Sequence, residues 1–227
     1  SLSIGEGDDG KLLLRCFAGC NFADILAAAG VESKTTTATR PPKLRNASTK
    51  LGRLVASYEY VNDHGELAYT VNRYSPKTFR PVLPDGRFGL NGTPRVLYRL
   101  PEITAATPET FIYVCEGEKD ADRLASEGLL ATTTAGGAKG SEKTPLDPLH
   151  GRHVCIIPDN DDAGREFAEG IAARLHGKAA SIRVVELPGV GEKGDVSDWL
   201  DAGHDAEDLD RLAANALEWE PQHDDDA

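Results

Sequence analysis

The chain has 227 residues, enough for one large or two small domains, and its hydrophobic content of 40% is compatible with a packed core. No apolar run approaches the roughly 20 residues that a membrane-spanning helix needs. Residues 1–15 also lack the basic start and apolar stretch of a signal peptide. Four cysteines in so long a chain do not make a disulfide scaffold. We therefore expect a cytoplasmic protein without a membrane partner.

The net charge of −12 is unevenly distributed along the chain. Residues 34–100 contain 12 Lys and Arg against 4 Asp and Glu, whereas residues 101–227 contain 11 against 28. An acidic surface repels nucleic acid, but a basic segment attracts its phosphates. The acidic part has two ordinary explanations, which are a solvated surface with an acidic tail and adaptation to high salt. A basic segment is thus joined to an acidic one.

Short elements are predicted before residue 109. Residues 11–20 suit a strand that ends in a turn, and residues 21–30 suit a helix that begins at an Asn and stops at a Gly. Residues 34–52 are basic and rich in Thr and Pro, which indicates a linker. Residues 55–61 and 67–71 flank Asn-Asp-His-Gly, a hairpin signal, so residues 53–108 predict a small β-rich domain.

After residue 109, continuous apolar runs alternate with helical patterns. The predicted strands are 111–115, 130–134, 153–157 and 181–187, and the predicted helices are 119–128, 163–176 and 206–219. This alternation predicts an α/β fold around a parallel sheet of about four strands. The predicted domains are 1–33, 34–52 (the linker), 53–108, 109–203 (the catalytic domain) and 204–227 (a helix and an acidic tail).

Acidic residues follow three of the predicted strands. Glu116 comes directly after the first, Asp159 and Asp161 follow the third, and Asp195 follows the fourth after a Gly-rich loop. Ligands of an open parallel sheet bind outside the carboxyl ends of its strands, so these acids are expected to converge. Crowded carboxylates repel one another unless hard cations such as Mg²⁺ or Mn²⁺ neutralise them. The pattern predicts a metal-dependent site for phosphoryl transfer on nucleic acid.

Two motifs in this region resemble a known family. They are Val114-Cys115-Glu116-Gly117-Glu118-Lys119-Asp120-Ala121 and Asp159-x-Asp161-x-x-Gly164. Both resemble the Toprim domain, which is shared by bacterial and phage primases, topoisomerases, some nucleases and recombination mediators. The resemblance covers roughly residues 109–203. Asp161-Asp162-Ala163-Gly164-Arg165 and Lys193-Gly194-Asp195-Val196-Ser197-Asp198 are most similar to phage and plasmid primases, including those fused to replicative helicases.

The resemblance implies roles for the acids. It implies a Toprim fold, with Glu116 as a general acid and base or a further metal ligand. It also implies that Asp159, Asp161 and Asp195 hold the metals. Asp198 is the alternative to Asp195 in the third position, and we prefer Asp195 because it comes first after the loop.

Four cations near the acids are candidate nucleotide ligands. Lys119, Lys139 and Lys143 are expected to contact phosphates, since a lysine can act there as a point charge. Arg165, early in a predicted helix, either contacts phosphate or pairs with nearby acids. Each lysine on its own is as compatible with a solvated surface.

Cys16 and Cys20 have the close spacing of a zinc knuckle. A closed zinc site needs four ligands, and only this pair is visible. The segment is similar to the second half of the zinc-binding domain that precedes Toprim in primases. We therefore expect the chain to begin inside that domain, with Zn²⁺ bound only if the missing ligand pair is present. The alternative is a pair of free thiols.

The basic middle segment combines cations with aromatic residues, a composition that suits single-stranded nucleic acid. The candidate nucleic-acid ligands are Arg73, Lys77, Arg80 and Arg87. The alternative is that these arginines line an interface with the acidic domain.

The leading hypothesis is a DNA primase that makes RNA primers on single-stranded DNA from NTPs, alone or with a replicative helicase in cis or in trans. The alternatives are a Toprim nuclease and a non-catalytic Toprim scaffold. A topoisomerase is disfavoured because there is no room for its additional tyrosine-bearing domain. A helicase within the chain is disfavoured because no Gly-x-x-x-x-Gly-Lys-Ser/Thr loop is present.

Overall fold

The computed structural model describes residues 2–6, 12–16 and 51–221, with side chains from residue 51 onward except at 138 and 139. The chain divides into two compact units, 1–49 and 50–227. In the first unit, β1 (Leu2–Glu6) pairs antiparallel with β2 (Leu12–Cys16). The predicted helix 21–30 lies outside the described residues. The finer domain boundaries stay predictions.

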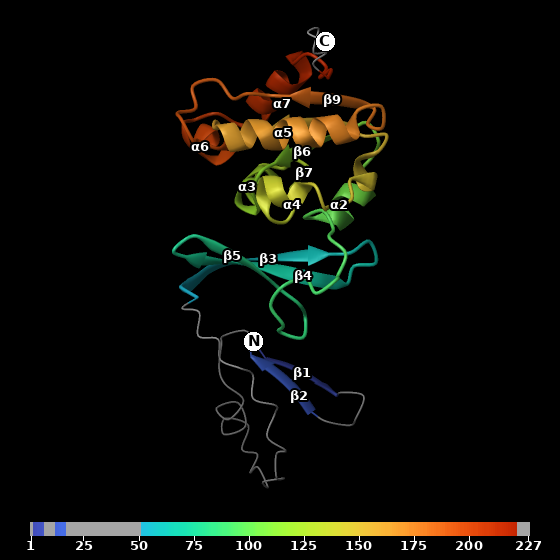
Figure 1. Ribbon diagram of the computed structural model, residues 1–227, viewed down its shortest axis with the longest axis vertical. Helices are drawn as coiled ribbons and strands as arrows, with labels where there is room; N and C mark the ends of the chain where they lie inside the picture. The colour runs from blue at the N-terminus through green and yellow to red at the C-terminus, as the bar shows by residue number, and fades with distance from the viewer. Residues whose placement is uncertain (1, 7–11, 17–50, 222–227) are drawn as a thin grey trace, which may run out of the picture. The chain divides into compact units, whose positions relative to one another are not determined.

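The second unit begins with a small antiparallel sheet in the order β3-β4-β5 (Figure 1). Its strands are β3 (Arg53–Val61), β4 (Leu67–Ser75) and β5 (Thr78–Val82). The predicted hairpin is confirmed, and Gly65 supplies the left-handed conformation (φ 81°) of its turn. We call this element the small sheet.

The rest of the unit is an α/β layer structure around four parallel strands in the order β7-β6-β8-β9. Its strands are β6 (Phe111–Cys115), β7 (Ala131–Thr132), β8 (His153–Ile157) and β9 (Ser181–Val184). Its helices are α2 (Leu100–Ala105), α3 (Glu118–Ser126), α4 (Gly137–Ser141), η1 (Asp147–Leu149), α5 (Asp162–Leu175), α6 (Val196–Asp201) and α7 (Ala206–Asn215). The predicted parallel sheet is confirmed.

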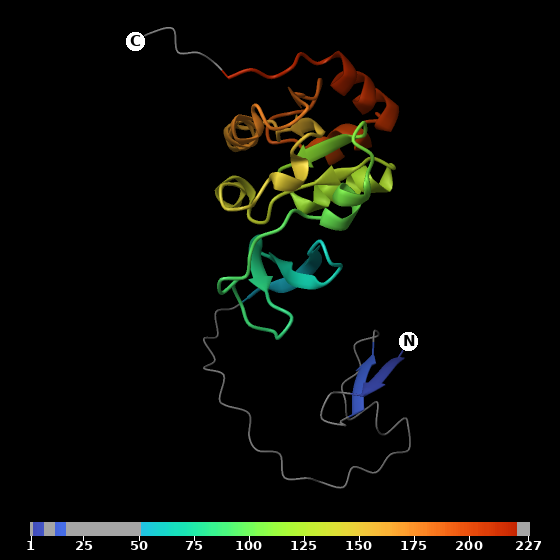
Figure 2. The ribbon, with the colours of Figure 1, turned by 90° about the vertical axis from the view of Figure 1, so that its right-hand side faces the viewer.

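Alternate side chains of the central strands enter two separate cores. Ile112 and Val114 of β6 pack with buried residues of α2 and α5, whereas Tyr113 and Cys115 pack with those of α3, α6 and α7. Figure 2 shows α5 end-on at one face of the sheet and α7 at the other. Burial on both faces explains why the strands are continuous apolar runs in the sequence.

The small sheet shares the second of these cores. Tyr58, Tyr60 and Tyr69 are buried in the same cluster as Tyr113, Leu124 and Trp199. The small sheet and the α/β layers therefore pack as one body, and the carboxyl edge of the parallel sheet lies next to the small sheet.

Several short elements differ from the sequence prediction. The predicted strand 130–134 shortens to β7, and the predicted helix 206–219 ends at Asn215. Helices α2, α4 and α6 have only five or six residues, too few to show a helical period in the sequence. Within the described residues, no helix is long and apolar enough to cross a membrane.

Gly164, in the first turn of α5, allows a direct test of how this helix packs against the loop after β8. A Cβ atom at Gly164 would lie 2.2 Å from the backbone oxygen of Asp159, which a neighbouring backbone cannot tolerate. We expect Gly164→Ala to destabilise the protein by about 1–3 kcal/mol in urea unfolding, because the helix must shift.

Gly170 of the same helix is the matched control. A Cβ atom there meets nothing within 4 Å. We expect Gly170→Ala to stabilise by about 0.5–1 kcal/mol, the difference in helix propensity. Equal effects at the two positions would contradict the described packing of α5.

Candidate active site

Acidic residues from three separate segments meet at the carboxyl edge of the parallel sheet. Glu116 follows β6, Asp159 follows β8, and Asp195 is the N-cap of α6. All three line one open cleft of about 400 Å³, together with Asp120 of α3. We call this the carboxylate cleft. The convergence expected from the sequence is therefore present for these acids.

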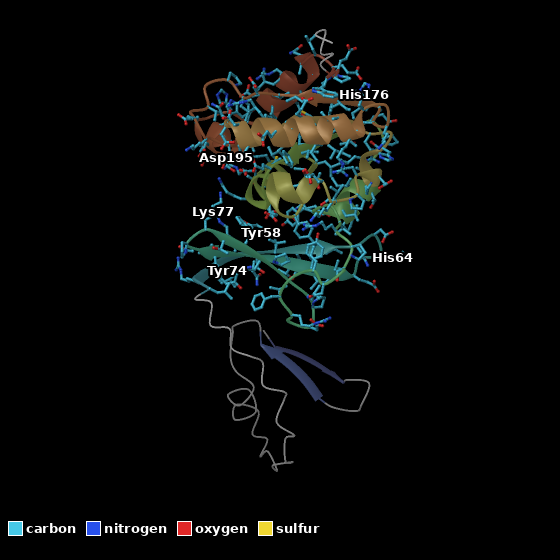
Figure 3. The ribbon with its side chains drawn as sticks, in the orientation of Figure 1. Tyr58, His64, Tyr74, Lys77, His176 and Asp195 are labelled. Carbon is cyan, nitrogen blue, oxygen red and sulfur yellow. The ribbon has the colours of Figure 1, made fainter. Side chains whose placement is uncertain are left out.

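The opposite wall of the carboxylate cleft comes from the small sheet. It is formed by Tyr58, Arg73, Phe79 and Lys77, the last in the turn between β4 and β5. In Figure 3, Lys77 and Asp195 lie on the same side of the unit, with Tyr58 between the small sheet and the α/β layers. Acids thus face cations and aromatic rings across the cleft.

The acids of the cleft repel one another. Burial, as the largest cause, and the charges of Glu116, Asp120 and Asp195 together raise the pKa of Asp159 to about 7. Burial also raises the pKa of Glu116, with the charge of Asp161 next in importance. The cleft therefore holds more negative charge than its own cations neutralise, the condition under which a bound cation is stabilising.

One lysine already contacts this acidic group. Lys119 Nζ donates to Asp195 Oδ2 at 2.7 Å and lies 3.7 Å from Asp120 Oδ1. Burial alone would raise the pKa of Asp195, but the hydrogen bonds from Lys119 and from backbone N–H groups lower it below its usual value. Asp120 is nearly buried and accepts a 2.6 Å hydrogen bond from Ser197 Oγ. Lys119 is thus the cation that offsets the charge of Asp195.

Asp161 and Asp198 do not line the carboxylate cleft, and the side chain of each accepts a helix-capping hydrogen bond. Asp161 caps α5 by accepting from the N–H of Gly164 at 2.9 Å. Asp198 forms a capping box with Asp195 at the start of α6, each side chain accepting from the backbone N–H of the other. Of the rivals for the third metal position, Asp195 faces the cleft. Their metal roles stay a prediction.

The predicted nucleotide ligands whose side chains are described do not line the same cavity. Lys119 lines the carboxylate cleft, and Arg165 lines a smaller neighbouring cavity of about 170 Å³ that it shares with Asp159. Arg165 also pairs with Asp162 at 2.7 Å. Lys143 is exposed and lines neither cavity, and the side chain of Lys139 lies outside the described residues.

Of the four predicted nucleic-acid ligands, two line the cleft and two do not. Arg73 pairs in register with Phe79 on the face of the small sheet that lines the cleft. Arg80 pairs in register with Asn72 and lies on the other face, because side chains alternate along a strand. Arg87 is exposed and pairs with Asp85 in a turn. Only Arg73 and Lys77 therefore face the acids.

Four side chains of the cleft, those of Tyr58, Phe79, Glu118 and Asp120, are absent from the predicted site residues. Asp120 follows Glu116 by four residues within the family motif, so the motif carried its signal. Tyr58 and Phe79 carried only the signal of aromatic residues in a basic segment. Phe79 is 38% exposed and its ring receives the Arg73 guanidinium at 5.9 Å. The side chains that reach the cleft follow from the register of the small sheet.

The carboxylate oxygens that line the cleft are chemically suited to bind a hard divalent cation. Carboxylate oxygens are the ligands that Mg²⁺ and Mn²⁺ prefer, and burial followed by the charges of neighbouring acids raises the pKa of Asp159. Among the described side chains, no three acidic, His or Cys residues are gathered closely enough to hold an ion. To join such a group of ligands, the Asp195 carboxylate would have to leave the Lys119 ammonium. As for zinc, Cys16 ends β2, and Cys20 lies outside the described residues.

Comparison with known proteins defines the class of the domain. Residues 113–200 match the family model described as Toprim-like, so this part of the chain is a Toprim-like domain. This confirms the resemblance drawn from the sequence motifs. No curated protein sequence matches the chain.

Solved structures extend the likeness beyond this domain. The primase fragment of the bacteriophage T7 primase-helicase aligns with a TM-score of 0.50 and 22% identity, covering 69% of this chain and 61% of that one. The Aquifex aeolicus primase (zinc-binding and RNA polymerase domains) gives 0.56 and 20%, covering 96% and 51%. A Pseudomonas aeruginosa DNA primase domain gives 0.51 and 21%, covering 71% and 51%. The chain spans about half to three fifths of these proteins, and the likeness establishes the shared fold.

The raised pKa of Asp159 predicts a pH-dependent stability of the metal-free protein. Since the folded-state pKa of about 7 lies above the unfolded value of about 3.9, this carboxyl costs nothing at low pH and destabilises increasingly as pH rises towards 7. We expect Asp159→Asn to match the wild type at pH 4 and to exceed it by about 1–2 kcal/mol at pH 8, after allowance for solvent screening.

Urea unfolding in a chelator at the two pH values measures this difference. Asp63→Asn, in the exposed hairpin turn, is the control and should show no such trend. A constant difference between Asp159→Asn and wild type across the range would contradict the crowding of carboxylates in the cleft.

Proposed function

We propose that the protein is a DNA primase that joins ribonucleotides into RNA primers on single-stranded DNA in the cytoplasm. The observation that carries the proposal is the carboxylate cleft, in which the acids of a Toprim-like domain face a wall of cations and aromatic rings. The acids suit phosphoryl transfer, and the wall suits a single-stranded template.

In this proposal Glu116, Asp159 and Asp195 would hold Mg²⁺ or Mn²⁺, which when bound would neutralise charge on the triphosphate and lower the pKa of the attacking hydroxyl. Glu116 is half-buried and burial raises its pKa, so it is suited to take the proton of the primer 3′-hydroxyl. Lys119 and Arg165 bind nucleotide phosphates on either side of Asp159. Asp120 of α3 is 6% exposed and lines the same cleft.

The wall of the small sheet would hold the template. Arg73 and Lys77 supply charge for phosphates, and Tyr58 and Phe79 present ring surfaces on which bases stack. Every base has a π-face, so such contacts bind a strand without reading its sequence. Arg80 and Arg87 lie outside this wall and are assigned no part in it.

The similar structures support two further elements of the proposal. The A. aeolicus match covers 96% of this chain, and that structure includes a zinc-binding domain, so Cys16 and Cys20 are proposed to supply two of four zinc ligands. The T7 fragment comes from a primase-helicase, and we propose a replicative helicase as the partner, in cis or in trans.

A priming assay tests the proposal. The protein would receive single-stranded DNA, NTPs and Mg²⁺ or Mn²⁺, and gel electrophoresis would detect short oligoribonucleotides. We expect Glu116→Gln to lower their yield by at least about 100-fold, because it removes the proton acceptor but keeps the side-chain shape. Degradation of the template would instead indicate a nuclease, and DNA binding without either reaction would indicate a scaffold.

The charge of Lys77 predicts a defined salt dependence. Because each phosphate contact releases a counterion, Lys77→Ala should weaken binding to single-stranded DNA and reduce the slope of log K against log salt by about 0.7–1. Fluorescence anisotropy from 50 to 300 mM salt would measure it. Lys178→Ala, exposed beyond the far end of α5, is the control and should leave the slope unchanged. An unchanged slope for Lys77→Ala would remove the small sheet from the template path.

A further inference from the structure

Helix α3 is held from two sides by two pairs of charged residues spaced four apart. Glu118 and Asp122 face the tyrosines of the small sheet and the segment after it: Tyr60 Oη donates to Glu118 Oε1 at 2.8 Å, and Tyr98 Oη donates to Asp122 Oδ1 at 2.9 Å. Residues four apart lie on one face of a helix. The small sheet thus contacts α3 through carboxylates.

The other pair faces the segment around α6. Lys119 binds Asp195 at 2.7 Å, and Arg123 binds Asp201 at 2.8 Å. One helix therefore connects the small sheet on one side with a proposed metal ligand on the other.

The contact between Tyr60 and Glu118 is the most buried of the four. Tyr60 is fully buried and Glu118 is 6% exposed. The ring of Tyr60 stacks on Tyr69, with centroids 4.7 Å apart and planes at 17°, which leaves its hydroxyl a single direction. A buried carboxylate that loses its hydrogen-bond donor gains hydration by moving towards water. Such a movement of Glu118 would displace the first turn of α3.

That first turn carries one cation and one further acid of the carboxylate cleft. Glu118 is followed directly by Lys119 and Asp120, which contact Asp195 and Ser197. We propose that Glu118 is a positioning residue: through Tyr60 it ties the small sheet to the first turn of α3, and so sets Lys119 and Asp120 in the carboxylate cleft. This inference rests on the proposed function for its metal but on the structure alone for the connection.

The two glutamates of Glu116-Gly117-Glu118 then have different tasks. Both border the cleft, but Glu118 is nearly buried with a phenol hydroxyl bound, whereas Glu116 is half-buried and faces Asp159 and Asp161. A metal would have to compete with Tyr60 for Glu118. The position of the small sheet, which carries the template wall, is thereby connected to the catalytic side.

Two tyrosines provide a matched test of the connection. Tyr60 and Tyr69 are both fully buried and stack on each other, and each hydroxyl has a partner, but the Tyr69 hydroxyl binds the backbone of Val96 instead of α3. Tyr60→Phe and Tyr69→Phe each remove one oxygen from the same stack. A merely structural role predicts similar behaviour of the two variants.

The connection predicts a difference in two measurements. In metal-free protein, Tyr60→Phe should increase hydrogen exchange of the amides of 118–126 at least about fivefold more than Tyr69→Phe does. In Mn²⁺ titrations followed by electron paramagnetic resonance, Tyr60→Phe should raise the dissociation constant about fivefold, with Tyr69→Phe near wild type. Equal exchange in α3 for the two variants would overturn the proposal.

A second comparison separates positioning from ligation. Glu118→Gln keeps an oxygen that accepts from Tyr60, so we expect it to retain Mn²⁺ affinity within about twofold, whereas Glu116→Gln should weaken it at least about tenfold. Loss of affinity in Glu118→Gln as large as in Glu116→Gln would make Glu118 a ligand and overturn the proposal. If the wild type binds no Mn²⁺, the proposed function fails, while the exchange comparison still decides the connection.

Discussion

The site depends on the mutual repulsion of carboxylates brought to one edge of a parallel sheet. Glu116 and Asp120 come from one segment, Asp159 and Asp195 come from two others, and the sheet order places all four around one cleft. Their charges add to burial in raising the pKa of Asp159 to about 7. A fold tolerates such crowding at a cost in stability, and a ligand that carries positive charge removes that cost. This constraint is the physical basis of the divalent metal binding proposed for the cleft.

Helix α3 contacts both an acid of the cleft and the small sheet. Its lysine offsets one acid of the cleft, and its glutamate is held by a tyrosine of the small sheet. The small sheet is therefore both a wall of the cleft and a contact of the helix that carries Lys119 and Asp120. Its buried tyrosines share a core with α6 and α7, so the two parts are packed as one body. A template bound to the wall would meet the acids in a fixed orientation.

Much of this could be predicted from the sequence. Buried strands are apolar runs, so β6 and β8 were placed correctly, and the acids after them marked the carboxyl edge of the sheet. Helix caps were harder, since Asp161 and Asp198 become recognisable as caps only when the starts of α5 and α6 are known. The division between Arg73 and Arg80 depends on strand register, which tertiary packing decides. Asp120 belongs to the family motif, but its place in the cleft and its hydrogen bond from Ser197 are visible only in the structure.

The most direct measurement is anomalous diffraction from crystals soaked in Mn²⁺. If repulsion in the cleft is what a metal relieves, an anomalous peak will lie between the carboxylates of Asp159 and Asp195, and the Lys119 ammonium will have moved away from its 2.7 Å contact with Asp195. No peak in the cleft, with the Lys119–Asp195 ion pair intact at saturating Mn²⁺, would contradict the account.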